Sequence, residues 1–223
     1  TCALPILLFL WGFALLAVVP AMNAVLPTRI RPSSGGYFTV RSIPWYLHNG
    51  LLYLVRFTFL PFVTMTPIGA LFLRAMVMRM GRRPRITTEN FSDVRLITLG
   101  DDVVIGGSAN VFCHYGGAGR LVIAPVVIGH RATIGEKATV MGDVVIGEGA
   151  TILAHAVLLP GTRVGPAERW GGAPARRIGH DEWERMKAAR TGAADPPRSV
   201  PEGVRGEPSA EGVGREPRAE KRG

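Results

Sequence analysis

Aliphatic side chains recur at every sixth position through the second half of the chain. The uninterrupted series is Ile128, Ile134, Val140, Ile146, Ile152, Leu158 and Val164. A period of six fits neither an α-helix, with about 3.6 residues per turn, nor a single strand, whose side chains alternate. It is the signature of a parallel β-helix, in which each six-residue unit supplies a short strand and a turn. The aliphatic side chains stack in an axial core, so no turn is stable by itself.

The repeat has a second series and one interruption. A small or β-branched residue stands four positions after each aliphatic one: Ala132, Ala138, Val144, Ala150, Ala156 and Thr162. Further back, Leu99, Ile105 and Val111 keep the spacing of six, and Val122 restarts it. Val122 follows Val111 by eleven positions instead of six, which predicts a five-residue insertion in the glycine-rich segment 114–120.

Composition divides the chain into three regions. We assign residues 1–85 to membrane-spanning or membrane-associated helices, residues 86–178 to the β-helix, and residues 179–223 to a short helix with a disordered tail. The last region is rich in Pro, Glu, Arg and Gly, so beyond a helix at about residues 181–190 it cannot build a core. The expected fold class is all-β, with helices before the repeat.

Residues 3–26 carry no charge and exceed the roughly 20 residues needed to cross a bilayer. A cleaved signal peptide is the alternative, but its apolar core would be shorter and would follow a basic stretch. Because the chain begins with Thr1 instead of Met, we expect a fragment or a trimmed chain. A membrane helix is therefore the preferred interpretation.

A second apolar run, residues 51–73, is interrupted by Arg56, Pro61 and Pro67. A charge and two prolines are costly inside a membrane span. The run is therefore interpreted as a kinked helix inside a bundle, or as two half-helices at the membrane interface.

Arginines follow this run at Arg74, Arg79, Arg82, Arg83 and Arg85. By the positive-inside tendency they place the β-helix in the cytoplasm, next to a membrane. Basic residues beside an apolar segment attract anionic lipid headgroups, whereas a nucleic-acid surface interleaves stacking aromatics. We therefore expect membrane lipid, and no nucleic acid, to account for much of the net charge of +9.

His114 is the candidate catalytic residue because it adjoins the interruption of the repeat. Loops on a rigid scaffold often carry function, and a neutral imidazole accepts a proton near neutral pH, as a general base must. Its neighbour Cys113 should point to the opposite face of a strand, so Cys113 is interpreted as a packed residue. Cys2 lies too far away to pair with Cys113, which fits a reducing compartment.

Histidines on a β-helix can also bind zinc, as in the γ-class carbonic anhydrases, which use an HxxxxH pair. The spacing of His114, His130 and His155 contains no such pair. We therefore expect no metal.

The repeat ends in GGAPARRI, residues 171–178, which resembles the GxPAKxI-type tail of the left-handed β-helix acyltransferases. Repeat and tail together cover residues 99–178 and resemble the hexapeptide transferase superfamily, which includes serine, galactoside and sugar acetyltransferases. The segment VFCHYG, residues 111–116, is similar to the place where serine acetyltransferases carry their catalytic histidine. The resemblance implies a left-handed β-helix.

A narrower resemblance covers residues 37–178. An apolar, basic, proline-broken segment, the approach RRPRITTENFSDVRLITLGDDVVIG, a histidine-bearing turn and further hexads are similar to the C-terminal membrane regions of polylysine synthetase-type nonribosomal peptide synthetases. That resemblance implies acyl transfer or peptide ligation beside a membrane, from a thioester-bound donor. The chain departs from that pattern because it shows no adenylation or carrier domain.

The acyltransferase resemblance implies a homotrimer with active sites in clefts between neighbouring β-helices. There His114 would deprotonate an amine or hydroxyl, which attacks the thioester of an acyl-CoA or of a phosphopantetheine carrier protein. Gly172, Pro174, Arg176 and Arg177 match the tail near the donor's nucleotide end, where an arginine suits a phosphate.

The family also implies three hexads in each coil, with coils beginning at Leu99, Val122, Val140 and Leu158. This grouping stacks His114 with Lys137 and His155, which become candidates for the acceptor side or for support of His114. Candidate acidic partners of His114, by proximity in hexad order, are Asp101, Asp102 and Glu136.

Two other functions stay open. A non-catalytic trimerisation or scaffold region of a larger synthetase predicts that His114 faces bulk solvent with no cleft. A zinc hydratase of the γ-carbonic anhydrase type predicts that His114 lies near histidines of a neighbouring chain.

Overall fold

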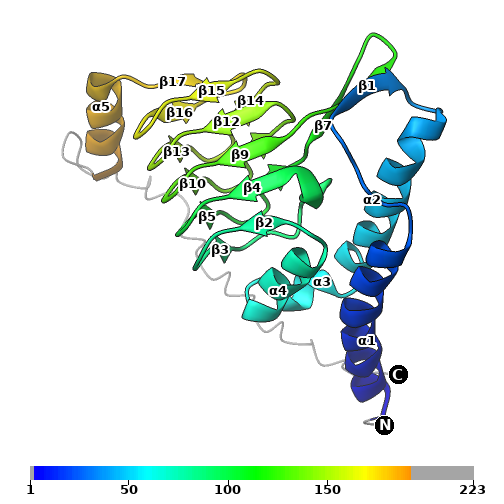
Figure 1. Cartoon of the computed structure of the whole chain (residues 1–223). Helices are drawn as coiled ribbons and strands as arrows, with labels where there is room; N and C mark the ends of the chain where they lie inside the picture. The colour runs from blue at the N-terminus through cyan, green and yellow to red at the C-terminus, as the bar shows by residue number, and fades with distance from the viewer. Residues whose placement is uncertain (1–2, 192–223) are drawn as a thin grey trace, which may run out of the picture. The chain divides into compact units, whose positions relative to one another are not determined.

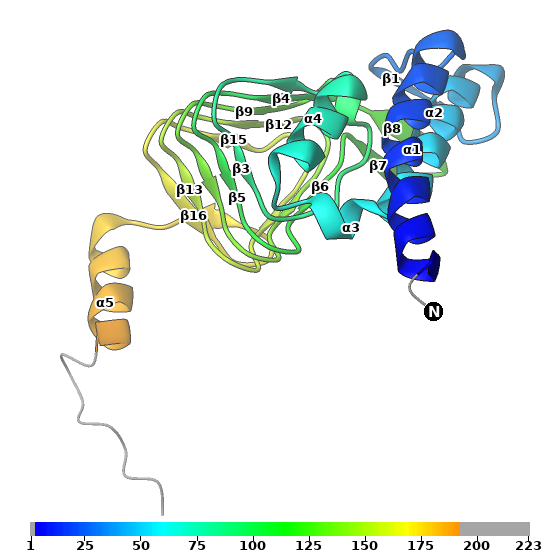
Figure 2. The same ribbon diagram turned by 90° about the horizontal axis from the view of Figure 1, so that it is seen from below.

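The computed structural model describes residues 3–191, and its main feature is a coiled ladder of short parallel strands (Figures 1 and 2). One sheet of the ladder contains β2 (Arg79–Met80), β4 (Ile97–Leu99), β9 (Val126–Ile128), β12 (Val144–Ile146) and β15 (Arg163–Val164). A second contains β3 (Arg85–Ile86), β5 (Val104–Ile105), β10 (Thr133–Ile134), β13 (Thr151–Ile152), β16 (Arg169–Gly171) and the antiparallel β17 (Arg176–Arg177). A third contains β6 (Asn110–Val111), β11 (Thr139–Val140) and β14 (Val157–Leu158).

The register shows that three hexads make one coil. Ile128 pairs with Ile146 and Ile146 with Val164, each 18 positions later. Leu99, however, pairs with Ile128, 29 positions later, and not with Val122. The coils therefore begin at Met80, which pairs with Leu99, and then at Leu99, Ile128, Ile146 and Val164, so the predicted starts at Val122, Val140 and Leu158 are wrong.

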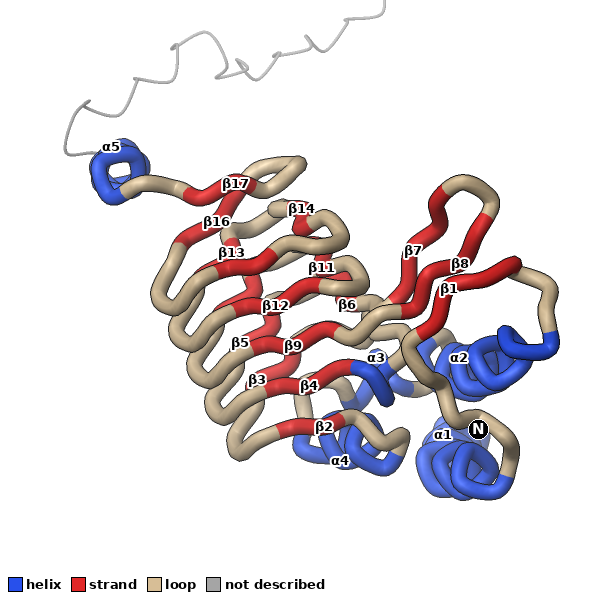
Figure 3. Tube along the Cα trace, turned by 45° about the horizontal axis from the view of Figure 1, so that its top comes forward, coloured by secondary structure: helices blue, strands red, loops and turns tan. Residues whose placement is uncertain are grey.

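The insertion accounts for this shift. It has 11 residues, the difference between 29 and 18, instead of the predicted five. It forms the hairpin of β7 (His114–Gly117) and β8 (Arg120–Ile123), to which β1 (Ser33–Gly36) adds an antiparallel strand. Figure 3 shows this small sheet projecting from the coils. Val122 lies in the hairpin, half-buried, and is not part of the axial core.

Both predicted series fill the axial core. The aliphatic positions are at most 4% exposed: Leu99, Ile105, Val111, Ile128, Ile134, Val140, Ile146, Ile152, Leu158 and Val164. The second series is fully buried from Ala132 to Ala156. The coils stack so closely that a Cβ on Gly135 would lie 2.4 Å from the backbone nitrogen of Ala154. Glycine is required there because the next coil's backbone occupies the space.

Helices precede and flank the first coils, and helices before the repeat were predicted. The predicted all-β class therefore describes the coils and not the chain as a whole. The helices are α1 (Ala3–Val25), α2 (Ile43–Arg56), α3 (Leu60–Val63) and α4 (Pro67–Ala75), with the 3-10 turns η1 (Val40–Ser42) and η2 (Val94–Leu96). The second apolar run is thus divided among α2, α3 and α4, and Pro67 starts α4 in the first-turn position that suits proline. Beyond residue 179, the predicted helix is α5 (His180–Thr191).

Helix α1 is long and apolar enough to cross a membrane over Leu4–Val25, by length and composition, and no other helix within residues 3–191 meets that test. It packs against α2 and against Phe59, which precedes α3 and whose ring centroid lies 5.3 Å from that of Phe13. A Cβ on Gly12 would lie 2.1 Å from the Phe59 ring, so glycine permits this approach. The predicted disordered tail and Cys2 lie outside the described residues.

Candidate active site

His114 is the first residue of β7, where the chain leaves the coil for the hairpin. Its side chain is 25% exposed. The indole of Trp45, from α2, lies edge-on to the imidazole with ring centroids 5.1 Å apart, and the ring of Phe112 lies 5.6 Å away. Aromatic walls therefore restrict the imidazole while part of it faces solvent.

The fully buried carboxylate of Asp93 holds the imidazole in place. Asp93 Oδ2 lies 2.5 Å from His114 Nδ1 and also accepts a hydrogen bond of 3.1 Å from the backbone N–H of Cys113. Asp93 Oδ1 accepts from the side-chain amide of Asn49 at 2.7 Å, and the backbone N–H of Asp93 donates back to Asn49 Oδ1 at 2.9 Å. N–H donors thus surround the buried charge.

This arrangement assigns the protons of the imidazole. A carboxylate accepts hydrogen bonds, so Nδ1 of His114 carries a proton and donates it to Asp93. In the neutral imidazole, Nε2 then keeps its lone pair. The site consequently offers an oriented imidazole whose Nε2 can take a proton in that form, and a buried carboxylate that would stabilise the imidazolium.

Helix α2 positions Asp93 through one face. Asn49, Tyr53 and Arg56 are spaced i, i+4 and i+7, so they project from the same side of the helix. Tyr53 bonds the hydroxyl of Ser92 at 2.6 Å, and Arg56 donates to the side chain of Asn90 at 2.7 Å. The segment before η2 is therefore attached to α2 at several points, and Asn49 reaches the carboxylate as part of that attachment.

None of the predicted acidic partners contacts His114 in the described part of the chain. Asp101 lies 3.5 Å from Nδ1 of His130, Asp102 pairs with Arg83 at 2.8 Å, and Glu136 is exposed. Asp93 was missed because it precedes the first recognised hexad. The structure brings it close because Phe91 bridges to Val111, which sets Asp93 one coil below Cys113.

Lys137 and His155 do not stack with His114, and that prediction is wrong. Val111 pairs with Val140, which puts His114 level with Asp143. Lys137 and His155 instead share a column with Ser108, because Ile105, Ile134 and Ile152 are in register. Both are exposed corner residues with left-handed backbone, at φ 55° and 60°. The wrong column was predicted because Val122 was counted as a hexad of the coils, which shifted the register of every later hexad by one place.

The predicted donor-binding residues close the last coil. Arg177 stands opposite Trp170 in the β16–β17 pair, and its Nε lies 3.2 Å from Glu168. Gly172 and Pro174 form the connecting turn, and Arg176 stands opposite Gly171. This tail lies three coils above His114, roughly 14 Å at about 4.8 Å per strand. One chain therefore does not bring His114 and the tail into contact.

Two buried groups near the site are neutral. Burial, reinforced by the carboxylate of Asp93, raises the pKa of the Cys113 thiol well above its usual value, which fits its prediction as a packed residue. Burial also lowers the pKa of His48 to about 4. Nδ1 of His48 lies 2.9 Å from Oδ1 of Asn23, which joins α2 to α1.

Within residues 3–191, no three His, Cys, Asp or Glu side chains form a group that could hold a metal ion.

Comparison with known proteins agrees with the fold. Residues 125–160 match the family described as Bacterial transferase hexapeptide (six repeats), and no curated protein matches the chain. A solved galactoside acetyltransferase in complex with coenzyme A is 17% identical, over 67% of this chain and 88% of that one, with a TM-score of 0.50.

Two further structures are similar. A hexapeptide-repeat-containing acetyltransferase from Vibrio cholerae O1 biovar eltor, complexed with acetyl coenzyme A, is 18% identical over 64% of this chain and 90% of that one, with a TM-score of 0.49. A maltose O-acetyltransferase from Clostridium difficile 630 is 18% identical over 66% and 91%, with a TM-score of 0.48. The matched repeat and the observed register together identify the coils of this chain as a left-handed hexapeptide-repeat β-helix, a fold that it shares with the solved galactoside acetyltransferase.

Proposed function

We propose that this protein is a membrane-tethered acyltransferase. It moves an acyl group from a pantetheine thioester, either acyl-CoA or a carrier-bound donor, to an amine or hydroxyl, with His114 as the general base. The observation that carries the proposal is the buried Asp93 carboxylate, 2.5 Å from Nδ1 of His114. Relatives in fold, such as the galactoside acetyltransferase, are described as binding coenzyme A, which supports a thioester donor.

The proposed reaction uses the free Nε2 of His114. Nε2 takes the proton of the acceptor's N–H or O–H as the acceptor atom attacks the thioester carbonyl. The tetrahedral intermediate then collapses, the C–S bond breaks, and the leaving thiolate takes the proton back from the imidazolium. Asp93 stabilises the imidazolium between these two steps and keeps its own negative charge.

A scaffold would not account for this pair. Burying a carboxylate costs several kcal/mol unless hydrogen bonds and a partner offset the cost. A histidine at a solvated corner, such as His155, needs no such partner. The buried Asp93 carboxylate is therefore better explained by a role in orienting the His114 imidazole and stabilising its charged form than by packing.

We extend the proposal to the donor and the assembly. His114 and the tail of Arg176 and Arg177 lie along the same coiled axis, three coils apart, so an extended donor could reach both by lying along the coils. In a homotrimer, the groove between neighbouring β-helices would provide that path. The narrower similarity to polylysine synthetase-type regions stays a prediction.

Membrane tethering rests on α1 and on apolar side chains of the next helices that face outward. Phe57, Phe62, Met65 and Leu71 are all more than 60% exposed. A groove of about 620 Å³ beside α4 adds the arginines Arg74, Arg83 and Arg85. Such a surface suits the boundary of an anionic membrane with the β-helix on the cytoplasmic side.

The test is acyl transfer by the full chain in neutral detergent, followed as thiol release from acetyl-CoA with a panel of amines and alcohols. His114→Asn keeps an N–H that can donate to Asp93 but has no basic lone pair, so the rate should fall by about 10²-fold or more. The melting temperature should stay close to that of the wild type. His155→Asn is the matched control and should keep full activity. Transfer that survives His114→Asn would favour the scaffold.

A further inference from the structure

The small sheet of β1, β8 and β7 connects His114 with a second site. Ser33 of β1 pairs with Ile123 of β8, and Ile123 pairs with His114 of β7. Directly opposed residues in antiparallel strands project from the same face. Ser33, Ile123 and His114 therefore form one row across the sheet, and at about 4.8 Å per strand Ser33 lies roughly 10 Å from His114.

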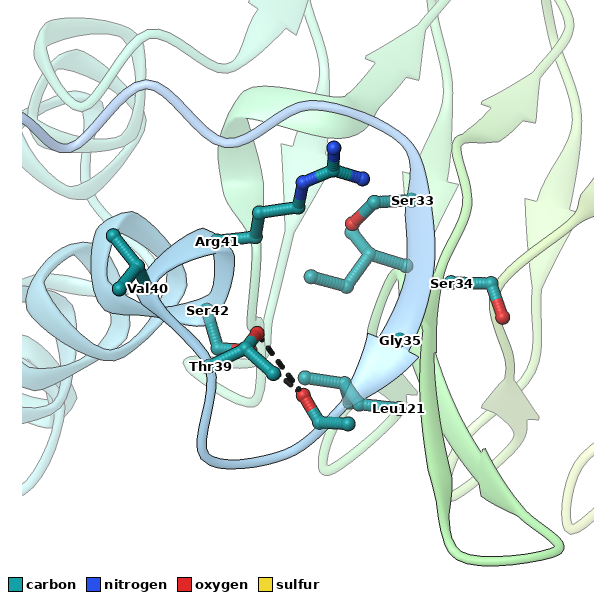
Figure 4. A pocket seen from close by; sticks show the side chains of 10 residues that line it. Ser33, Ser34, Gly35, Thr39, Val40, Arg41, Ser42 and Leu121 are labelled. Atoms are coloured by element: carbon teal, nitrogen blue, oxygen red, sulfur yellow. Dashed lines mark hydrogen bonds between the residues drawn. The ribbon is translucent and has the colours of Figure 1, made fainter.

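A cavity of about 400 Å³ lies at the Ser33 end of this row. Its walls include Arg29, Arg31, Arg41, Ser33, Trp45 and Ile123. Trp45 and Ile123 also adjoin His114, so the cavity lies close to the imidazole, but His114 itself does not line the cavity and the buried Ile123 lies between them. Figure 4 shows the guanidinium of Arg41 extending from η1 toward Ser33 on β1, over an adjoining cavity of about 330 Å³.

The three arginines give this cavity a positive charge. No ion pair joins Arg29, Arg31 or Arg41 to an acidic side chain within residues 3–191. Residues 1–88 contain no Asp or Glu. Three guanidinium groups around one cavity repel one another, and a bound anion would relieve that repulsion.

The indole of Trp45 adds an unsatisfied donor. Its Nε1 is buried and makes no hydrogen bond among the residues that the structure describes. A buried polar group without a partner costs about 1–3 kcal/mol, so such groups are rare without a reason. Nε1 is closed to a molecule the size of water, so a ligand oxygen in the cavity would reach it only if the ring or the side chains covering it moved on binding.

We propose, building on the acyl transfer proposed above, that this arginine cavity binds an anionic group of the acyl acceptor. The acceptor is then an amine or alcohol that carries a phosphate or carboxylate about 10 Å from its nucleophilic atom, the length of the row from Ser33 to His114. Arginine recognises both anions through paired hydrogen bonds. The bound anion fixes one end of the acceptor and places the other beside Nε2 of His114.

The rival explanation is topological. Arg29 and Arg31 follow α1 closely, where basic residues commonly mark the cytoplasmic end of a membrane helix and contact lipid headgroups. That explanation does not require Arg41, which comes later in the chain, to share their cavity with Ser33 and Trp45. The two explanations predict different ligands, so binding separates them.

The first measurement is binding without any donor. The full chain in neutral detergent is titrated by calorimetry with 6-aminohexyl phosphate and with its neutral counterpart, 6-aminohexanol. We expect the phosphate to bind at least about tenfold more tightly, and Arg31→Gln or Arg41→Gln to weaken it about tenfold. Arg120→Gln, in β8 but outside the cavity, should bind as the wild type does. Equal binding of the two compounds by the wild type would overturn the proposal.

The second measurement is acetyl transfer from acetyl-CoA to the same two amines. The phosphate should be favoured in kcat/KM, Arg41→Gln should remove that preference, and transfer to 6-aminohexanol should be unchanged by that substitution. A shorter amine, 2-aminoethyl phosphate, should be a poor acceptor because it cannot span the row.

The remaining outcomes are also decisive. If Arg31→Gln and Arg41→Gln reduce binding to phosphatidylglycerol vesicles while acceptor binding is unaffected, the arginines contact lipid and the proposal is wrong. If the phosphate binds through the arginines but no thioester yields transfer, the acyl-transfer function fails and the anion site stands.

Discussion

Replacing Asp93 by Asn tests the centre of the proposed site while keeping its shape. The carboxylate accepts hydrogen bonds on both oxygens, from Asn49 on Oδ1 and from His114 and Cys113 on Oδ2. An amide has only one accepting oxygen. In one orientation its NH₂ faces His114 and Cys113, and in the other it faces the NH₂ of Asn49, so a donor meets a donor either way.

Rotation of the Asn49 amide does not resolve the conflict. The Oδ1 of Asn49 already accepts from the backbone N–H of residue 93 at 2.9 Å, and a flip would place an NH₂ against that N–H. One buried donor therefore stays unsatisfied, which costs about 1–3 kcal/mol in stability. If the new NH₂ faces the imidazole, His114 moves its proton to Nε2 and loses the lone pair that acts as base. We expect kcat to fall by about 10²-fold or more.

The assay is thiol release from acetyl-CoA by the full chain, alongside the urea midpoint of unfolding. Asp101→Asn is the matched control, since Asp101 also lies beside a histidine, His130, but both side chains are well exposed. That variant should change neither rate nor stability appreciably. Full activity in Asp93→Asn, or an equal rate loss in Asp101→Asn, would refute the assignment of Asp93 as the residue that orients the base.

Further tests address the fold and the proposed membrane span of α1. Ile146→Asp should unfold the coils, because a buried carboxylate finds no partner there, whereas Val145→Asp on the outer face of the same strand should melt nearly as the wild type. Gly12→Ala should separate α1 from the buried Phe59 ring and lower the melting temperature, whereas Gly50→Ala, with open space around its Cβ, should stabilise α2 by about 1 kcal/mol. Burial lowers the pKa of His48 from 6.5 to about 4 in the folded chain. As the pH falls from 6.5 to about 4, the unfolded chain therefore takes up this proton before the folded chain does. The free energy of unfolding should fall by about 3 kcal/mol in total over this range. His48→Gln should flatten that decline in urea titrations, and an unchanged decline would contradict the assignment. The chain should resist carbonate extraction from membranes through α1, and release by carbonate would contradict a spanning helix.

The axial core could be predicted from the sequence because each hexad repeats the same local requirement. Every Ile or Val of the series meets its copy in the next coil, so period and burial report the same fact. The coil grouping could not be predicted because Val122 imitates the series. In β8 the half-buried Val122 lies between the buried Leu121 and Ile123, so burial alternates along this strand. Val122 therefore belongs to the hairpin, and it matches the six-residue spacing of the coils in the sequence alone.

The site was predictable only at His114, which borders the irregularity of the repeat. Asp93 lies 21 residues earlier and reaches the imidazole because one coil brings it level with Cys113. Asn49 and Trp45 come from a helix whose contacts depend on tertiary packing. The polar residues at positions 49, 53 and 56 interrupt an apolar helix at i, i+4 and i+7, and this spacing is the one sequence signal of that packing.

The helical region therefore contributes to the proposed chemistry as well as to the proposed membrane attachment. Asn49 holds Asp93, and Trp45 forms one wall of the imidazole. The next residue back from Asn49 is His48, which bonds Asn23 of α1. The contact of α2 with α1, through His48, and its contact with Asp93, through Asn49, therefore lie one residue apart. The geometry of the proposed catalytic pair consequently depends on the same helices that would meet the lipid, so the coils alone, without α2, would retain His114 but lose the support of its acidic partner.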